Sequence, residues 1–200
     1  MNSSLAARTI GRHHPCKPNK ALLRCVGRAI SDFDMIKAED RVLVAVSGGK
    51  DSLSLVHLLN HMRRHAPINF ELAAMTVDPQ VEGFDPASLQ DYFSSLGITY
   101  FYRTQAIMEQ AKQHMAKDSF CSFCSRMKRG LMYATARSEG YNVLALGQHL
   151  DDLAESFLMS AFNGGQLRTM KAKYRNDAND IDIIRPLVYA RERQTADYAK

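Results

Sequence analysis

The stretch RVLVAVSGGKDS, residues 41–52, decides the fold of this chain. Its first half is an apolar run typical of a buried strand, and its second half joins two glycines to a lysine and two serines. Residues 51–64 continue with Leu55, Leu59 and Met62 on one helical face, so a helix begins within or just after the motif. Glycines let backbone N–H groups converge on an anion, and the N-terminus of the following helix adds a positive end. The stretch therefore predicts a strand, a phosphate-binding loop and a helix in succession.

The same alternation of strands and helices continues along the chain. Further strands are expected at residues 70–78, 98–104 and 142–149 and within 181–200, and further helices at 20–34, 87–97, 105–117, 124–139, directly after residue 149 and at the C-terminal end. This pattern predicts an α/β fold whose parallel twisted sheet is covered by helices on both faces. Ligands of such sheets bind at the carboxyl ends of the strands, which places SGGKDS, Val77-Asp78 and GQHLDD (147–152) at one rim.

The charge of the chain is unevenly distributed. The net charge is +5, yet residues 1–31 carry six basic side chains and no acidic one, so the remainder is close to neutral. We expect residues 1–36 to form a basic arm and helix, either held against a polyanion or solvated, and residues 37–200 to form the main domain. No apolar run approaches the roughly 18 residues of a membrane-spanning helix, and the N-terminus lacks the apolar core of a secretory signal. A cytoplasmic protein without a membrane partner is therefore expected.

The glycine-rich loop departs from two common nucleotide-binding patterns. The Walker pattern fails because no glycine lies six residues before Lys50 and because Asp51 follows it; G-x-G-x-x-G is absent as well. SGGKDS after a strand instead resembles the PP-loop of ATP pyrophosphatases, which have a Rossmann-like fold, cleave ATP between its α and β phosphates and adenylate a substrate. For Asp78, contact with the nucleotide and capping of the turn before Pro79 are both open. The resemblance implies an ATP-binding set of Ser47, Gly48, Gly49, Lys50, Asp51, Ser52, Asp78 and Gly147.

The block GQHLDDLAESF, residues 147–157, supports the same resemblance. Two carboxylates open the helix that follows, where they could simply favour the helix dipole. A carboxylate pair beside a triphosphate also suits Mg²⁺, which completes its shell with phosphate oxygens and water. In the PP-loop family a second motif, GHHxDD, follows a later strand, and here Gln148 stands where its first histidine often stands. The implied magnesium ligands are Asp51, Asp151 and Asp152.

The segment CSFCSRMKRGLMY, residues 121–133, places Cys121 and Cys124 at the start of a helix with basic neighbours. Such a position favours thiolates, and a CxxC pair can be a redox pair, half of a zinc site or part of an iron–sulfur ligand set. A thioredoxin-like site is disfavoured because its motif should follow the first strand. Cys25 lies on the apolar stripe of its helix and is interpreted as a small buried hydrophobe.

Together these motifs resemble the tRNA 2-thiocytidine synthetase family. SGGKDS, CSFCSRMKRGLMY, GQHLDD, FNGG and IRPL occur in that family's order and spacing between about residues 20 and 193. The resemblance implies an ATP-dependent tRNA sulfurtransferase that adenylates an anticodon-loop cytidine and inserts sulfur at C2, using a 4Fe-4S cluster and a sulfur donor of the cysteine desulfurase type. Its third cysteine ligand has no counterpart after Cys124, so either the C-terminal end is incomplete, a partner supplies a ligand, or the cluster chemistry has been lost. A homodimer is one option. The implied catalytic residues are Lys50, Asp51, Asp152, Cys121 and Cys124.

RNA must reach the same rim, and basic side chains lie near the two later motifs. As phosphate contacts we expect Arg126, Lys128, Arg129, Arg168, Lys171 and Lys173, although each alone is also explained as a solvated surface charge. Two rival functions also fit these motifs. One is another PP-loop tRNA-modifying enzyme, a thiouridine or lysidine synthetase; the other is a non-catalytic RNA-binding or sulfur-carrier module.

Overall fold

The computed structural model describes residues 18–78, 80, 87–105 and 120–200. Six strands form one sheet in the order β3-β2-β1-β4-β6-β5, in which only β5 runs antiparallel to its neighbour. The strands are β1 (Arg41–Ala45), β2 (Glu71–Asp78), β3 (Thr99–Thr104), β4 (Val143–Ala145), β5 (Lys173–Arg175) and β6 (Asp182–Ile184). The predicted sheet is thus confirmed for its parallel part.

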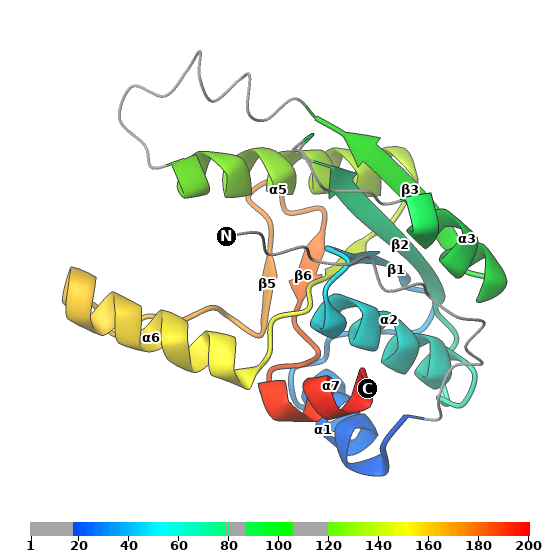
Figure 1. Cartoon of the computed structure of the whole chain (residues 1–200), viewed down its shortest axis with the longest axis horizontal. Coiled ribbons are helices and arrows are strands. Elements are labelled where there is room, and N and C mark those ends of the chain that lie inside the picture. Colours follow the sequence, from blue (N-terminus) through cyan, green and yellow to red (C-terminus); the bar gives the residue numbers. More distant parts are fainter. Residues whose placement is uncertain (1–17, 79, 81–86, 106–119) are drawn as a thin grey trace, which may run out of the picture.

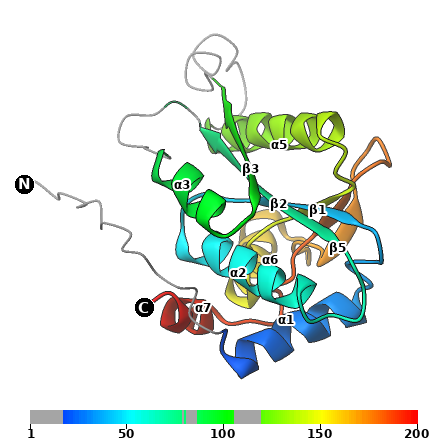
Figure 2. The same ribbon diagram turned by 90° about the vertical axis from the view of Figure 1, so that its right-hand side faces the viewer.

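Helices cover both faces of the sheet, as predicted (Figure 1). The helices of the described residues are α1 (Lys20–Asp32), α2 (Lys50–Arg63), α3 (Ala87–Ser95), α5 (Phe120–Ser138), α6 (Leu150–Gly164) and α7 (Glu192–Tyr198). Along β1 the side chains alternate between the faces: Val42 and Val44 pack with α1, α2 and α3, whereas Leu43 packs with α5. Figure 2 shows α5 alone on its side of the sheet and the other three on the opposite side. Because β1 is buried on both faces, RVLVAV reads as a continuous apolar run.

Two predictions about the N-terminal region have different outcomes. Helix α1 forms and buries Leu22, Val26 and Ala29 in the core, with Cys25 packed against the same cluster. The basic arm before residue 18, with Arg8, lies outside the described residues, as does the helix expected at 105–117. The division at residue 36 remains a prediction.

The antiparallel edge strand β5 was not expected from the sequence, which showed only a basic run there. Lys173 and Arg175 flank Asp182 of β6, with nitrogen–oxygen distances of 3.5 and 3.0 Å. A three-residue strand with two charged side chains has no recognisable alternation, so only its partner strand defines it.

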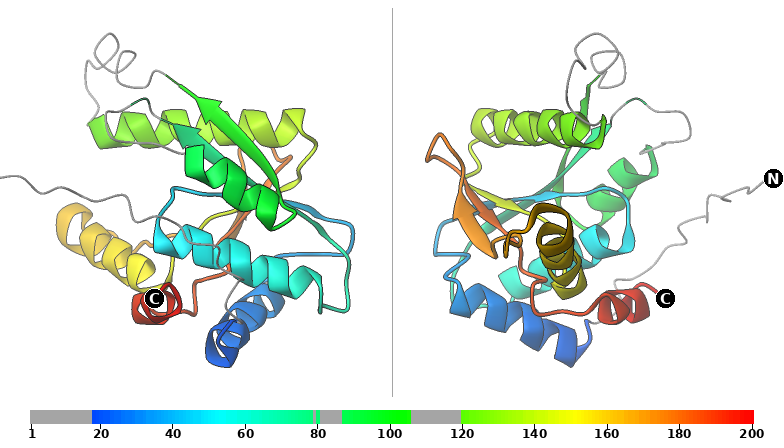
Figure 3. Two further views of the ribbon diagram at one scale, coloured as in Figure 1. Left: turned by 45° about the vertical axis from the view of Figure 1, so that its right-hand side comes forward. Right: turned by 90° about the vertical axis from the view of Figure 1, so that its left-hand side faces the viewer.

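Helix α6 projects from the body of the molecule (Figure 3). It has no buried residue, and Phe162 is 83% exposed. Its apolar periodicity therefore predicts the helix correctly but not its burial. Within the described part of the chain, no helix is long and apolar enough to cross a membrane.

Candidate active site

The PP-loop joins β1 to α2 in a conformation that needs glycine. Gly48 has a φ of +82°, a backbone region that side-chain-bearing residues rarely adopt. Gly49 is the N-cap of α2 and makes no side-chain capping hydrogen bond, so the first turn of α2 presents its N–H groups without a side-chain cap. Ser52 stabilises the loop: its hydroxyl donates to the Gly49 carbonyl at 2.9 Å and accepts from the Ser47 N–H at 3.2 Å. The predicted loop and helix start therefore have the expected form, and anion binding by them stays a prediction.

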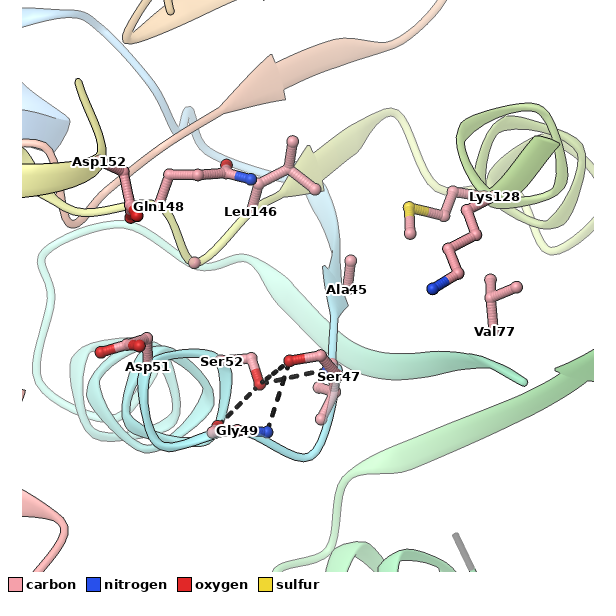
Figure 4. Close-up of a pocket in the computed structure, with 13 residues that line it drawn as sticks. Ala45, Ser47, Gly49, Asp51, Ser52, Val77, Lys128, Leu146, Gln148 and Asp152 are labelled. Atoms are coloured by element: carbon pink, nitrogen blue, oxygen red, sulfur yellow. Dashed lines mark hydrogen bonds between the residues drawn. The ribbon is translucent and has the colours of Figure 1, made fainter. Parts of the chain in front are cut away.

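A pocket of about 560 Å³ opens above this loop at the carboxyl ends of β1, β2 and β4 (Figure 4). That volume is in the range of small-molecule sites. Its lining residues are Ala45, Val46, Ser47, Gly49, Asp51, Ser52, Val77, Lys128, Met132, Leu146, Gly147, Gln148 and Asp152. SGGKDS, Val77 and GQHLDD, which were predicted to lie at one rim of the sheet, therefore contribute to one cavity.

Gly147 lets the β4–α6 connection lie directly on the start of α2. A Cβ atom at this position would come within 3.2 Å of the backbone N and Cα of Ser52. Backbone atoms cannot rotate away as a flexible side chain can. An alanine at position 147 would therefore push the β4–α6 connection away from the start of α2. The contact brings Asp152 to the same pocket as Asp51.

The three predicted magnesium ligands do not lie together. Asp51 and Asp152 both line the pocket. Asp152 also caps α6, because its Oδ2 accepts from the His149 N–H at 2.8 Å. Asp151 is outside the lining: its carboxylate accepts from the Glu192 N–H at 2.7 Å and pairs with Arg191 at 2.8 Å. These contacts, the hydrogen bond first, lower the pKa of Asp151.

Lys50 and Asp78 also lie outside the pocket lining. The Lys50 ammonium is 2.9 Å from Glu192 and 3.0 Å from Asp51, and these two carboxylates raise its pKa. Asp78 accepts from the Gln80 N–H at 2.6 Å and from the Tyr102 hydroxyl, so it caps the turn after β2. From β2 it is Val77 that reaches the cavity.

Helix α5 faces the PP-loop across the pocket, and sequence reasoning missed its role there. Lys128 was grouped with the RNA contacts, but its side chain extends from α5 into the cavity (Figure 4). Lys128 follows Cys124 by four residues and Cys121 by seven, so the three share a helical face. That spacing was the signal available in the sequence. Arg126 and Arg129 are exposed.

The cysteine pair fits part of an iron–sulfur ligand set. Both cysteines lie in the first turns of α5, and Cys124 is half-buried near the pocket-lining face. Two thiolates do not complete a cluster site. Among the described residues no group of three or more His, Cys, Asp or Glu side chains could hold a metal ion.

The basic side chains predicted after α6 differ in their surroundings. Arg168 and Lys171 are exposed, whereas Lys173 donates to the Asp34 carbonyl and pairs with Asp182. Arg185 is buried beside this run and donates to the Gln148 side chain at 3.0 Å. Gln148 therefore lies in the pocket with a fixed orientation.

Comparison with known proteins agrees with this geometry. Residues 20–200 match the family model described as the PP-loop domain. A tRNA-cytidine(32) 2-sulfurtransferase of Geobacter sulfurreducens is 40% identical over 182 residues, which cover 90% of this chain and 71% of that protein. The chain belongs to this PP-loop sulfurtransferase family. The resemblance inferred from the motifs is confirmed.

Other sulfurtransferases of the family show the same relation. The proteins of Xylella fastidiosa and Pelobacter propionicus, with the same name, are 40% and 42% identical. The alignments cover 94% and 90% of this chain but 63% and 67% of those proteins. This chain thus spans about two thirds of the length of these sulfurtransferases.

Solved structures confirm the PP-loop fold. The U34-tRNA thiolase NcsA of Methanococcus maripaludis, solved with its [4Fe-4S] cluster, superposes with a TM-score of 0.73 at 25% identity. The match covers 90% of this chain and 61% of that one. An NH3-dependent NAD synthetase of Campylobacter jejuni matches with a TM-score of 0.53 at 16% identity and shares the fold alone. An ATP-binding PP-loop and a cluster-containing thiolase neighbour both fit the expected cofactors.

Proposed function

We propose that this sulfurtransferase-family domain uses ATP to adenylate an anticodon-loop cytidine of tRNA and replaces its C2 oxygen with sulfur. One observation carries the proposal: the PP-loop and the cysteine-bearing helix α5 line opposite sides of a single pocket. Helix α5 lines the pocket through Lys128 and Met132 rather than through its cysteines, and Cys124 lies about one turn before Lys128. Phosphate chemistry and sulfur chemistry can therefore act from neighbouring parts of one site. The names of the sulfurtransferase relatives and of the NcsA thiolase support tRNA as the substrate.

In the first step the cytidine O2 attacks the α-phosphorus of ATP. The bond between the α-phosphorus and the bridging oxygen breaks, and pyrophosphate leaves with the electron pair. The uncapped N–H groups in the first turn of α2 and the hydroxyl of Ser47 stabilise the phosphate charge, and the Lys128 ammonium reaches the pocket from the other side. Asp51 and Asp152 supply the oxygen ligands that Mg²⁺ prefers, and the metal would neutralise phosphate charge there.

In the second step a sulfur nucleophile attacks C2 and AMP leaves with the former C2 oxygen. Cys121 and Cys124 would hold two corners of an iron–sulfur cluster, which supplies the sulfur chemistry. A third ligand, a sulfur donor of the cysteine desulfurase type and a homodimer stay predictions. So do the six RNA contacts, of which Lys128 also lines the pocket and Lys173 also pairs with Asp182.

The test is incubation of the anaerobically reconstituted protein with ATP and unmodified tRNA. We expect AMP and pyrophosphate to form in a tRNA-dependent manner, and nucleoside analysis to find 2-thiocytidine. A thiouridine or lysidine product would replace this proposal with one of its rivals. Tight tRNA binding without AMP release would indicate a binding module.

A further inference from the structure

Helix α7 contacts the first turns of both helices that begin at the pocket. It lies beside α2 in the fold (Figure 1). Just before and at its start, the Arg191 guanidinium and the Glu192 N–H hold the two oxygens of Asp151 on α6. One short segment, about 140 residues after the PP-loop, thus connects both acidic helix starts.

Thr195 acts on the pocket carboxylate of α2. Its side chain is fully buried, and its hydroxyl donates to Oδ1 of Asp51. The Glu192 carbonyl, 2.8 Å away, is the alternative acceptor for the same hydroxyl. Because a hydroxyl has one hydrogen, it serves one acceptor at a time, and the carboxylate is the stronger one. Thr195 therefore fixes the rotation of the Asp51 carboxylate at the edge of the pocket.

Glu192 acts on the neighbouring lysine. Its carboxylate lies 2.9 Å from the Lys50 ammonium and forms an ion pair with it. Lys50 is only partly exposed and is absent from the pocket lining, so its charge is held on the α7 side of α2. A phosphate group that recruits Lys50 must compete with Glu192.

We propose that Thr195 and Glu192 are positioning residues of the ATP site. Thr195 fixes the orientation in which the Asp51 carboxylate meets the magnesium ion of MgATP, and Glu192 keeps Lys50 paired until phosphate oxygens replace the Glu192 carboxylate. The inference rests on the proposed use of ATP. The alternative is that α7 only packs against α2, through residues such as Tyr198 near His57.

The first test compares Thr195→Val with Thr195→Ser by calorimetric titration with ATP, in excess Mg²⁺ and again in chelator without metal. Valine keeps the size of the side chain and removes the hydrogen-bond donor. The dissociation constant for MgATP should rise about tenfold, and that for metal-free ATP should stay within about twofold of the wild-type value. Serine keeps the donor and should restore MgATP binding. Equal losses with and without metal, or no loss in either, would overturn the assignment of Thr195.

The second test uses Glu192→Gln, which keeps the N–H bond to Asp151, with Asp197→Asn on the same helix as the charge-matched control. We expect Glu192→Gln to bind metal-free ATP and inorganic pyrophosphate about two- to fivefold more tightly, the range of an exposed ion pair. The control should match the wild type. Unchanged or weaker binding in Glu192→Gln would overturn the assignment of Glu192.

The same titrations separate this inference from the proposed function. If the wild type binds ATP and the variants behave like it, the inference fails and the function stands. If the variants shift as expected but no thiocytidine forms, the positioning roles stand and the thiolation proposal fails. A wild type that binds no ATP contradicts both.

Discussion

Helices α2 and α6 begin at the same pocket with an aspartate in the first turn, yet they are built differently. Seven residues of α2 are buried, including Leu55, Leu58 and Leu59, whereas none of α6 is. Helix α6 is anchored at its start, through the His149–Asp152 capping box and the contacts of Asp151. The two carboxylates of the site therefore differ in what supports them: Asp51 lies on a helix packed into the core, whereas Asp152 is held by the cap of an exposed helix.

The largest expected effect is on catalysis. Asp152→Asn keeps an acceptor for the α6 cap and removes the charge at the pocket, so tRNA-dependent AMP formation should fall about 100-fold or more. Asp151→Asn is the matched control, one residue away and outside the pocket lining. The rate of tRNA-dependent AMP formation in Asp151→Asn should stay within about fivefold of the wild-type rate. Equal losses in the two variants would remove the distinction between these aspartates.

The second-largest expected effect is on stability, because substitutions on α2 and α6 should change the free energy of unfolding by different amounts. Leu58→Ala creates a cavity behind α2 and should lower the free energy of unfolding by about 2–5 kcal/mol in chemical denaturation. Leu158, on α6, is 49% exposed, and Leu158→Ala should cost less than about 0.5 kcal/mol. A large loss for Leu158→Ala in the isolated chain would mean that α6 is covered in solution.

The contact between the two loops should give an intermediate effect. Gly147→Ala forces a Cβ atom against the Ser52 backbone, with an expected cost of about 1–3 kcal/mol. The KM for ATP should rise, because the displaced segment carries part of the pocket. Gly130→Ala, where nothing lies within 4 Å of the added Cβ, is the control and should leave the KM unchanged. An unchanged KM in Gly147→Ala would show that the loops separate without consequence.

The smallest effect concerns the anchor of α6. The pKa of Asp151 is lowered in the folded protein, so its contribution to stability is present above the unfolded pKa of about 4 and is lost as the pH falls through the folded value. The melting temperature of Asp151→Asn should therefore lie slightly below that of the wild type at pH 7 and converge with it in strong acid. A constant difference across that range would exclude the charge of Asp151 as the cause.

The sequence predicts the features that are local. The strand, loop and helix of residues 41–63 follow from consecutive residues, and the parallel sheet follows from their repetition. Contacts between distant segments are not visible in this way: β5 is defined by its pairing with β6, and Thr195 meets Asp51 across 144 residues. The apolar spacing of Phe157 and Phe162 indicates a helix but does not say which surface covers it.

The central claim is that the cysteine-bearing helix and the PP-loop share one nucleotide pocket. Lysine-reactive labelling with and without ATP, read out by mass spectrometry, tests it through Lys128, with the exposed Lys171 as reference. The structure predicts that ATP alone protects Lys128 and leaves Lys171 reactive. Protection of Lys128 by tRNA but not by ATP would contradict the shared pocket and return Lys128 to the RNA contacts.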